Sequence, residues 1–121
     1  MYVKTINWID KNFQEAEVIV SDGCTDLLCF SCPFNKTVNE ELKEPIRCFN
    51  VNNVFLAQQL AVHVCKNTSF FGYSICGKLV DRKNKIVILG DIELSLEDAY
   101  IPYDIPENSY IEFEVSRLDL Y

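Results

Sequence analysis

The longest alternation of apolar and polar residues in the chain covers residues 71–97, and it predicts a β-hairpin. In the second half of this stretch one parity is apolar and consists of Ile88, Ile92, Leu94 and Leu96. Acidic and other polar residues occupy the opposite parity. The charged turn 81–85 separates this half from a first half with the same alternation. Each predicted strand therefore has one face on a core and one face in water.

Shorter patterns predict further strands at residues 2–9, 15–20, 46–49 and 110–116. Residues 27–30 are apolar on both faces, which predicts a central strand covered on each side. Asp22-Gly23 is a pair favoured in tight hairpin turns, because glycine adopts a positive φ without steric cost. The polar segment 35–45 predicts a loop. At Arg117 the apolar parity shifts by one residue, which predicts either a bulge or the end of the last strand.

Residues 53–66 fit two structures. Leu56, Leu60 and Val64 recur at i, i+4 and i+8, which favours a short helix. Residues 61–65 fit a strand equally well, so both remain open, with the helix preferred. Glycines inside the strand patterns indicate bends, which allow a sheet to close. The predicted fold is mainly β, with α+β possible: a small antiparallel barrel of about six or seven strands with one short mid-chain helix, forming one domain over residues 1–121.

The segment from Gly77 to Leu120 contains a glycine, a strand, a charged turn, a strand, a proline-containing loop and a closing strand that ends Arg117-Leu118-Asp119-Leu120. This order resembles the second half of small bacterial OB-like β-barrel proteins of uncharacterised function. The resemblance covers about a third of the chain and implies a similar barrel. It is a pattern of strands and turns, so it implies no site residues.

Composition places the protein among folded cytoplasmic proteins. Apolar residues make up 49% and charged residues 24% of the 121 residues, which excludes a disordered chain. The first ten residues are interrupted by Lys4, Asn7 and Asp10, so they resemble neither a signal peptide nor a membrane-spanning helix. We therefore expect a cytoplasmic protein without a membrane partner, in which the six cysteines stay reduced.

Candidate catalytic and metal-binding residues are few. Cys29 and Cys32 have the spacing of a zinc or redox pair, but no second such pair supplies the other ligands. We expect them to be buried and inert. His63 is the only histidine, and it faces Cys65 only if that segment is a strand. With no evident third group to orient them, the sequence predicts no enzyme, no metal and no cofactor.

The net charge of −7 is unevenly distributed. Residues 91–121 contain nine acidic side chains and only one basic side chain, Arg117. This acidity disfavours nucleic acid as a partner. The small basic turn formed by Arg82, Lys83 and Lys85 is interpreted as solvated. If the strand at 91–97 pairs with the last strand, the carboxylates of both strands form one acidic outer face.

A loop stiffened by two prolines borders that face and carries Tyr100, Tyr103 and Asp104. Tyrosines on a preorganised loop are typical anchors of protein interfaces, and surrounding acids attract a basic partner. The alternatives are acids that serve only solubility and tyrosines that cap the barrel end. The predicted protein-binding residues are Glu93, Glu97, Tyr100, Tyr103, Asp104, Glu112 and Glu114.

The sequence therefore predicts a non-enzymatic, acidic protein-binding module with a basic protein partner. By analogy of charge and size, such a module suits an immunity or antitoxin protein that neutralises a basic toxin. One alternative is a barrel that binds a small ligand or a carbohydrate, with Trp8, Phe70 and Phe71 as walls. Another is an OB-like protein that binds single-stranded nucleic acid, which the charge opposes.

Overall fold

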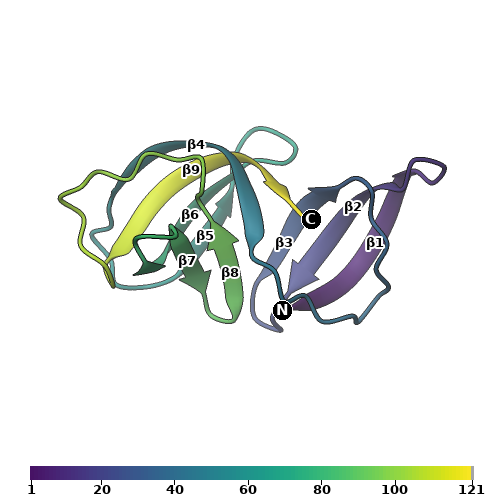
Figure 1. Ribbon diagram of the computed structural model, residues 1–121, viewed down its shortest axis with the longest axis horizontal. Coiled ribbons are helices and arrows are strands. Elements are labelled where there is room, and N and C mark those ends of the chain that lie inside the picture. The colour runs from purple at the N-terminus through teal and green to yellow at the C-terminus, as the bar shows by residue number, and fades with distance from the viewer. Residues whose placement is uncertain (121) are drawn as a thin grey trace.

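The computed structural model describes residues 1–120, and these residues form nine β-strands and no helix (Figure 1). The strands are β1 (Tyr2–Asp10), β2 (Glu15–Ser21), β3 (Asp26–Ser31), β4 (Ile46–Leu56), β5 (His63–Lys66), β6 (Tyr73–Asp81), β7 (Ile86–Leu89), β8 (Ile92–Ser95) and β9 (Tyr110–Asp119). The prediction of a mainly β fold is confirmed, whereas the predicted count of six or seven strands is too low.

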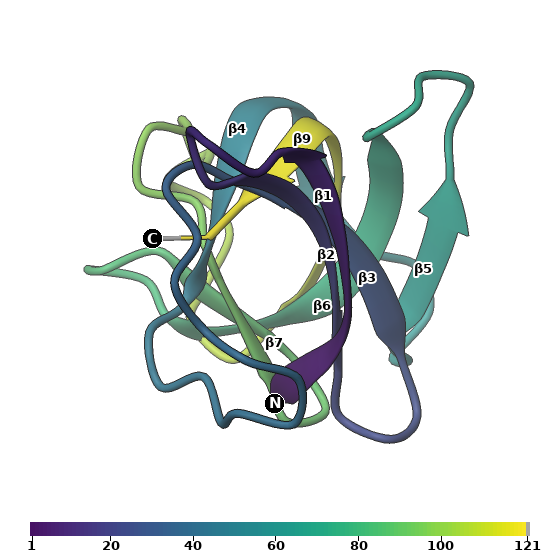
Figure 2. The same cartoon turned by 90° about the vertical axis from the view of Figure 1, so that its right-hand side faces the viewer.

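Five of these strands close into a barrel in the order β9, β4, β8, β7 and β6, with β6 pairing back onto β9. Neighbours in this ring are antiparallel except β4 and β8, which pair in parallel through Ile46 and Leu94. Figure 2 looks into the ring. The interior is filled by alternating apolar side chains such as Leu79, Val87 and Phe113, so the barrel is a packed core.

The first three strands form an antiparallel meander beside the barrel (Figure 1). The inward parity of β2 holds Ala16, Val18 and Val20, all fully buried, which explains the alternation in that segment. One parallel bridge joins the meander to the barrel, between Phe30 of β3 and Asp119 of β9. The buried side chains of the meander and the barrel belong to one continuous hydrophobic cluster.

The helix predicted within residues 53–66 is wrong. Strand β4 continues to Leu56, which pairs with Ile111 of β9, and His63 begins β5. The i, i+4 pattern fails as a helix signal because Leu60 is 80% exposed and contributes nothing to a core. Long-range pairing with β9 therefore outweighs the local periodicity.

The predicted hairpin over residues 71–97 contains three strands, because β7 ends at Leu89 and β8 begins at Ile92. Gly90 has a φ of +60° and forms the turn between them, where bends inside one strand had been expected. Gly77 does lie inside a strand, as expected, and there β7 approaches β6 closely. A Cβ atom there would lie 2.6 Å from Val87 Cγ1.

The parity shift at Arg117 does not end the last strand. Strand β9 continues to Asp119, and its register against β4 is unbroken at this point. Val51 pairs with Val115, and Cys48 pairs with Leu118, and all four side chains face the core. The two pairs are an odd number of residues apart on each strand, so β4 and β9 change parity together. Between these pairs Asn50 has a φ of 57° and donates a hydrogen bond to Ser116. The shift is therefore a shared bend of two strands.

Candidate binding groove

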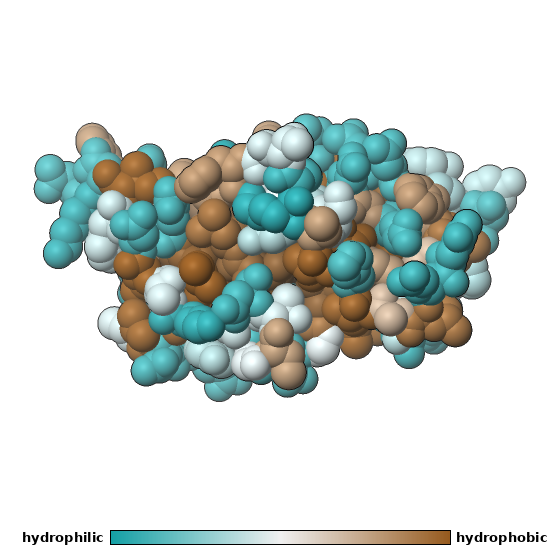
Figure 3. Space-filling view, turned by 180° about the vertical axis from the view of Figure 1, so that it is seen from behind, coloured by the Kyte–Doolittle hydropathy of each residue, from teal (hydrophilic) through white to brown (hydrophobic). Residues whose placement is uncertain are grey.

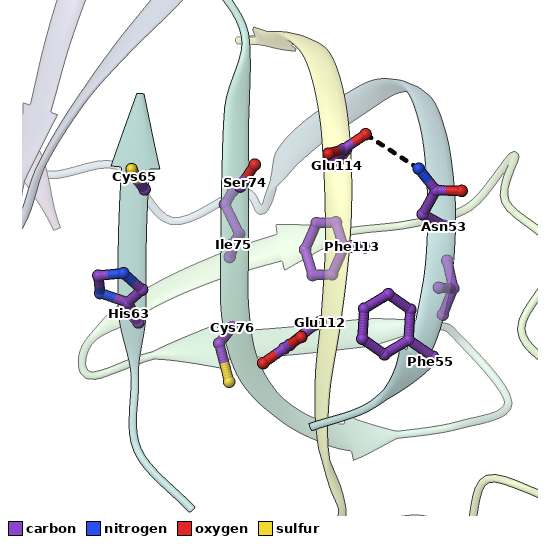
Figure 4. Close-up of a pocket in the computed structure, with 11 residues that line it drawn as sticks. Asn53, Phe55, His63, Cys65, Ser74, Ile75, Cys76, Glu112, Phe113 and Glu114 are labelled. Carbon is purple, nitrogen blue, oxygen red and sulfur yellow. Dashed lines mark hydrogen bonds between the residues drawn. The ribbon is translucent and has the colours of Figure 1, made fainter. Parts of the chain in front are cut away.

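A groove of about 440 Å³ lies on the outer face of four neighbouring strands, β5, β6, β9 and β4 (Figure 4). Side chains that face each other across paired strands have Cβ atoms roughly 5 Å apart, so strand register builds the groove. One row across the sheet consists of His63, Cys76, Glu112 and Phe55. The next row consists of Cys65, Ser74, Glu114 and Asn52.

The floor of the groove is acidic. Glu112 and Glu114 are on the same parity of β9, while Ile111, Phe113 and Val115 between and beside them are buried. Glu114 accepts a hydrogen bond of 3.0 Å from Asn53 Nδ2 (Figure 4). Within residues 1–120 neither carboxylate has an ion-pair partner, and no lysine or arginine lines the groove.

Asn53 reaches Glu114 because β4 is irregular at this point. The register of β4 against β9 shifts between Asn52 and Phe55, and Asn53 has a φ of 57°. Asparagine tolerates this conformation better than most residues. The bulge therefore turns the Asn53 amide toward the groove and adds an uncharged donor to an acidic floor.

Within the described part of the chain, no hydrogen bond joins the imidazole of His63 to a thiol of the groove. Burial, and then the charge of Glu112, raise the pKa of the Cys76 thiol, so the thiol stays protonated at neutral pH. His63 and Cys65 share a face, as the strand alternative required, but Cys65 Sγ contacts the carbonyl of Lys66 at 3.7 Å. Among the described residues, no three metal-ligating side chains converge on a metal site.

The single acidic face expected from strands 91–97 and 110–116 is not formed. The ring places β4 between β8 and β9, so Glu93 and Glu97 do not adjoin Glu112 and Glu114. Glu97 instead lies 4.0 Å from the guanidinium of Arg47, beside the Asp98 contact at 3.6 Å. Two acids of the last quarter, Glu97 and Asp98, thus have a basic partner from earlier in the chain.

The tyrosines of the 96–109 loop do not cap the barrel. Ile101 and Ile105 are buried and perform that role, while Tyr100 and Tyr103 are 75% and 86% exposed. Asp104 is exposed beside Tyr103. Tyr100 lines a second hollow, together with the basic residues of the β6–β7 turn. The structure therefore separates the tyrosine loop from the acidic groove and places Tyr100 in one lining with three basic residues and Glu107.

The other sequence candidates are also dispersed. Cys29 is buried as expected, but Cys32 is exposed, because the strand ends before it. Trp8 lies opposite Ala16 on the inner face of the meander, and its ring centroid is 6.2 Å from that of Phe34. Phe71 makes edge-to-face contacts with Phe70 and with Phe30, and the Phe30 side chain is on the outer face of the meander. The aromatic walls proposed for a ligand site therefore lie on opposite faces of one sheet.

The aromatic cluster on the outer face is not a ready platform for nucleic acid. Lys66 directs its ammonium group to the carbonyls of Ser69, Phe70 and Gly72. Arg117 is bound to Asp119. Both cations of the cluster are therefore engaged within the chain, whereas a nucleic-acid platform needs cations that are available for phosphates. Broad hydrophobic areas are visible on the rear face of the molecule (Figure 3).

Sequence reasoning missed the groove as a site. It placed Glu112 and Glu114 on the outer parity, which is correct, and it noted that His63 and Cys65 could share a face. It did not include Asn53, Phe55 or Cys76 among the predicted binding residues. Their convergence depends on β9 lying between β4 and β6, a long-range pairing for which the chain contains no local signal.

The described residues define a class: a closed five-stranded β-barrel with an attached meander and an acidic outer groove. No protein-family model, curated protein or solved structure matches this chain. Among residues 1–120 there is also no helix of the length and apolarity that crossing a membrane requires. Function must therefore be argued from the groove itself.

Proposed function

We propose that the protein is a non-enzymatic binding module that takes basic side chains of a protein partner into the groove. The observation that carries the proposal is the pair of carboxylates, Glu112 and Glu114, on the floor of a hollow with no lysine or arginine in its lining. A lysine or arginine side chain supplies the missing positive charge, and arginine can bind a carboxylate through two parallel hydrogen bonds.

The walls suit the same partner. Phe55 is 51% exposed on one side of the groove, and an aromatic face attracts a cation. Strand β5 forms the opposite wall and is the last strand of the sheet, with β6 as its one strand neighbour among the described residues. A net charge of −7 adds long-range attraction for a basic protein.

By charge and size, the role we propose for this module is that of a cytoplasmic immunity or antitoxin protein against a basic toxin. The OB-like relationship suggested by residues 77–120 remains part of this proposal. The five-stranded closed barrel supports it in strand number, whereas the expected helix is missing. Tyr100, Tyr103 and Asp104 form a second proposed contact set, separate from the groove.

The test uses a fluorescent octa-arginine peptide as the probe, with affinity measured by anisotropy at low and moderate salt. The double variant Glu112→Gln/Glu114→Gln should bind the peptide about tenfold more weakly, because two charge pairs worth about 1.4 kcal/mol together are lost. Binding by the unchanged protein should also weaken with salt, as for any surface charge contact.

The matched control is the double variant Glu41→Gln/Glu44→Gln, which removes the same charge from two exposed positions outside the groove. It should bind the peptide nearly as well as the unchanged protein. Equal losses in the two double variants would show that the peptide responds only to net charge, and the groove would then not be the binding site.

The tyrosine loop is tested separately with Tyr100→Ala/Tyr103→Ala. A partner captured from the host by the unchanged protein should bind this variant several kcal/mol more weakly if the loop supplies anchor residues. Unchanged affinity for that partner would remove the loop from the interface and leave the groove proposal intact.

A further inference from the structure

A second hollow, of about 530 Å³, lies between the β6–β7 turn and the 96–109 loop. Its lining residues are Arg82, Lys83, Lys85, Tyr100, Ile101 and Glu107. The sequence indicated that the three basic residues form a solvated turn. The structure instead brings the 96–109 loop against them, so that their side chains border a shared space with an exposed tyrosine.

The three basic side chains of this hollow have no ion-pair partner among residues 1–120. Two acidic residues adjoin the basic ones, Asp81 at the end of β6 and Glu107 in the lining of the hollow itself. Asp81 accepts hydrogen bonds from the amide and the side chain of Asn84, at 3.0 and 2.8 Å. Glu107 accepts a 3.0 Å bond from the main-chain nitrogen of Arg82. The lining contains three basic side chains and one acidic side chain, Glu107, so the hollow has an excess of positive charge in a protein that is acidic overall.

The contacts that hold these cations do not neutralise them. Lys85 Nζ donates to the carbonyl of Ala99 at 2.6 Å. Arg82 Nη2 lies 3.5 Å from the carbonyl of Ile101, which is a long hydrogen bond. Arg82 Nη1 is buried and has no acceptor within the described chain. An enclosed donor without an acceptor is costly, so this guanidinium has unused capacity for an anion.

We propose that this hollow binds the phosphate group of a small molecule that carries a flat ring, such as a nucleoside monophosphate. A small rotation of Arg82 presents the guanidinium fork to two phosphate oxygens. Lys83 and Lys85 add positive charge. Tyr100 is 75% exposed on the border of the hollow and offers its ring for stacking. The volume of the hollow falls in the range of small-ligand sites.

The experiment is an amide NMR titration at fixed ionic strength with three probes: inorganic phosphate, adenosine monophosphate and adenosine. Both phosphate-bearing probes should give saturable shifts at residues 82–85 and 99–101, with the tighter binding for the monophosphate. Adenosine should bind at least about tenfold more weakly, because charged hydrogen bonds to the phosphate are missing. Absence of saturable shifts at these residues, or equal binding of adenosine and its monophosphate, would overturn the proposal.

Three variants distinguish the contributions. Arg82→Gln should weaken both phosphate-bearing probes, and Lys83→Gln should do so by about fivefold. Lys83 is exposed, and only its main-chain amide takes part in a hydrogen bond, to Asp81. Replacing its side chain therefore keeps the test valid if loss of Arg82 disturbs the loop. Tyr100→Ala should weaken the monophosphate but not inorganic phosphate. The control Lys11→Gln removes an exposed charge elsewhere, and an equal loss in that variant would contradict the assignment.

Discussion

Arg117 shows how much a single side chain contributes to joining the two parts of the molecule. Its guanidinium makes two hydrogen bonds to Asp119, at 2.6 and 3.0 Å, which raise the pKa of the arginine. The same group lies 4.8 Å from the ring of Phe30 on β3 and 4.9 Å from the ring of Phe49 on β4. Arg117 therefore contacts the meander and the barrel at once.

Replacing Arg117 by lysine should lower the free energy of unfolding by about 1 kcal/mol, because lysine keeps the charge but loses the planar stacking and the two-pronged hydrogen bond. Urea unfolding measures this change. The control Lys4→Ala breaks an exposed ion pair with Asp26 and should have a much smaller effect. Equal effects would show that the aromatic contacts of Arg117 add nothing.

Asp22 makes a second connection, through hydrogen bonds alone. Its carboxylate accepts bonds from the amides of Cys24 and Thr25 in its own turn, and from the amide of Asp91 in the β7–β8 turn at 3.1 Å. Partial burial raises the pKa of Asp22, but these amides outweigh it, and the pKa is lowered from 3.8. The charged form is therefore the one that holds the two turns together.

A lowered pKa in the folded state means that Asp22 stabilises the fold above the unfolded pKa and loses that contribution as the pH falls through the folded pKa. The stability difference between the unchanged protein and Asp22→Asn should thus be largest near neutral pH and shrink below about pH 4. Urea unfolding of both proteins from pH 7 to pH 3 measures it. A difference that stays constant over this range would contradict the role of the charge.

At the scale of elements, the clearest constraint is the close approach of β6 and β7 at Gly77. An added methyl group would lie 2.6 Å from Val87 Cγ1, 2.7 Å from Leu89 Cδ2 and 3.0 Å from the carbonyl of Ile88. The carbonyl is part of the backbone, so it cannot give way as a side chain does. Gly77→Ala should therefore destabilise the fold by about 2 kcal/mol or more, measured by thermal or urea unfolding.

The comparison variant is Gly23→Ala. Gly23 has a φ of +93° but no atom within 4 Å of an added methyl group, so only backbone strain opposes the change. We expect a smaller loss there, of about 1 kcal/mol. A larger loss at Gly23 than at Gly77 would mean that β6 and β7 can separate easily, and that the glycine is not needed for closure of the barrel.

The elements also show what local sequence can and cannot predict. In β2 the alternation is uninterrupted, and every apolar residue of the predicted parity is buried. In β4 the polar residues Asn50, Asn52 and Asn53 interrupt the pattern, so the strand was predicted to end at Phe49. Its continuation depends on pairing with β9, which lies some sixty residues later. The groove depends on the same pairing, so its residues could be assigned an outward face but not a set of neighbours.

At the scale of the whole molecule, the meander and the barrel share one hydrophobic cluster. Besides Arg117 and Asp22, the hydroxyl of Tyr73 on β6 accepts a 2.9 Å hydrogen bond from the amide of Leu28 on β3. Burial raises the pKa of Tyr73, so the hydroxyl stays neutral and keeps this role at physiological pH. These connections favour a single cooperative unit, as expected for a chain of 121 residues.

One unit should give one unfolding transition, and the chain contains a convenient probe for this. Trp8, the only tryptophan, lies in the meander, so its fluorescence reports on that part alone. Amide exchange at Val87 in β7 reports on the barrel core. Because the two parts share buried apolar surface, the free energies of opening from the two probes should agree within about 1 kcal/mol under the same conditions. A Trp8 transition at clearly lower urea concentration would instead show that the meander unfolds first and leaves the barrel intact.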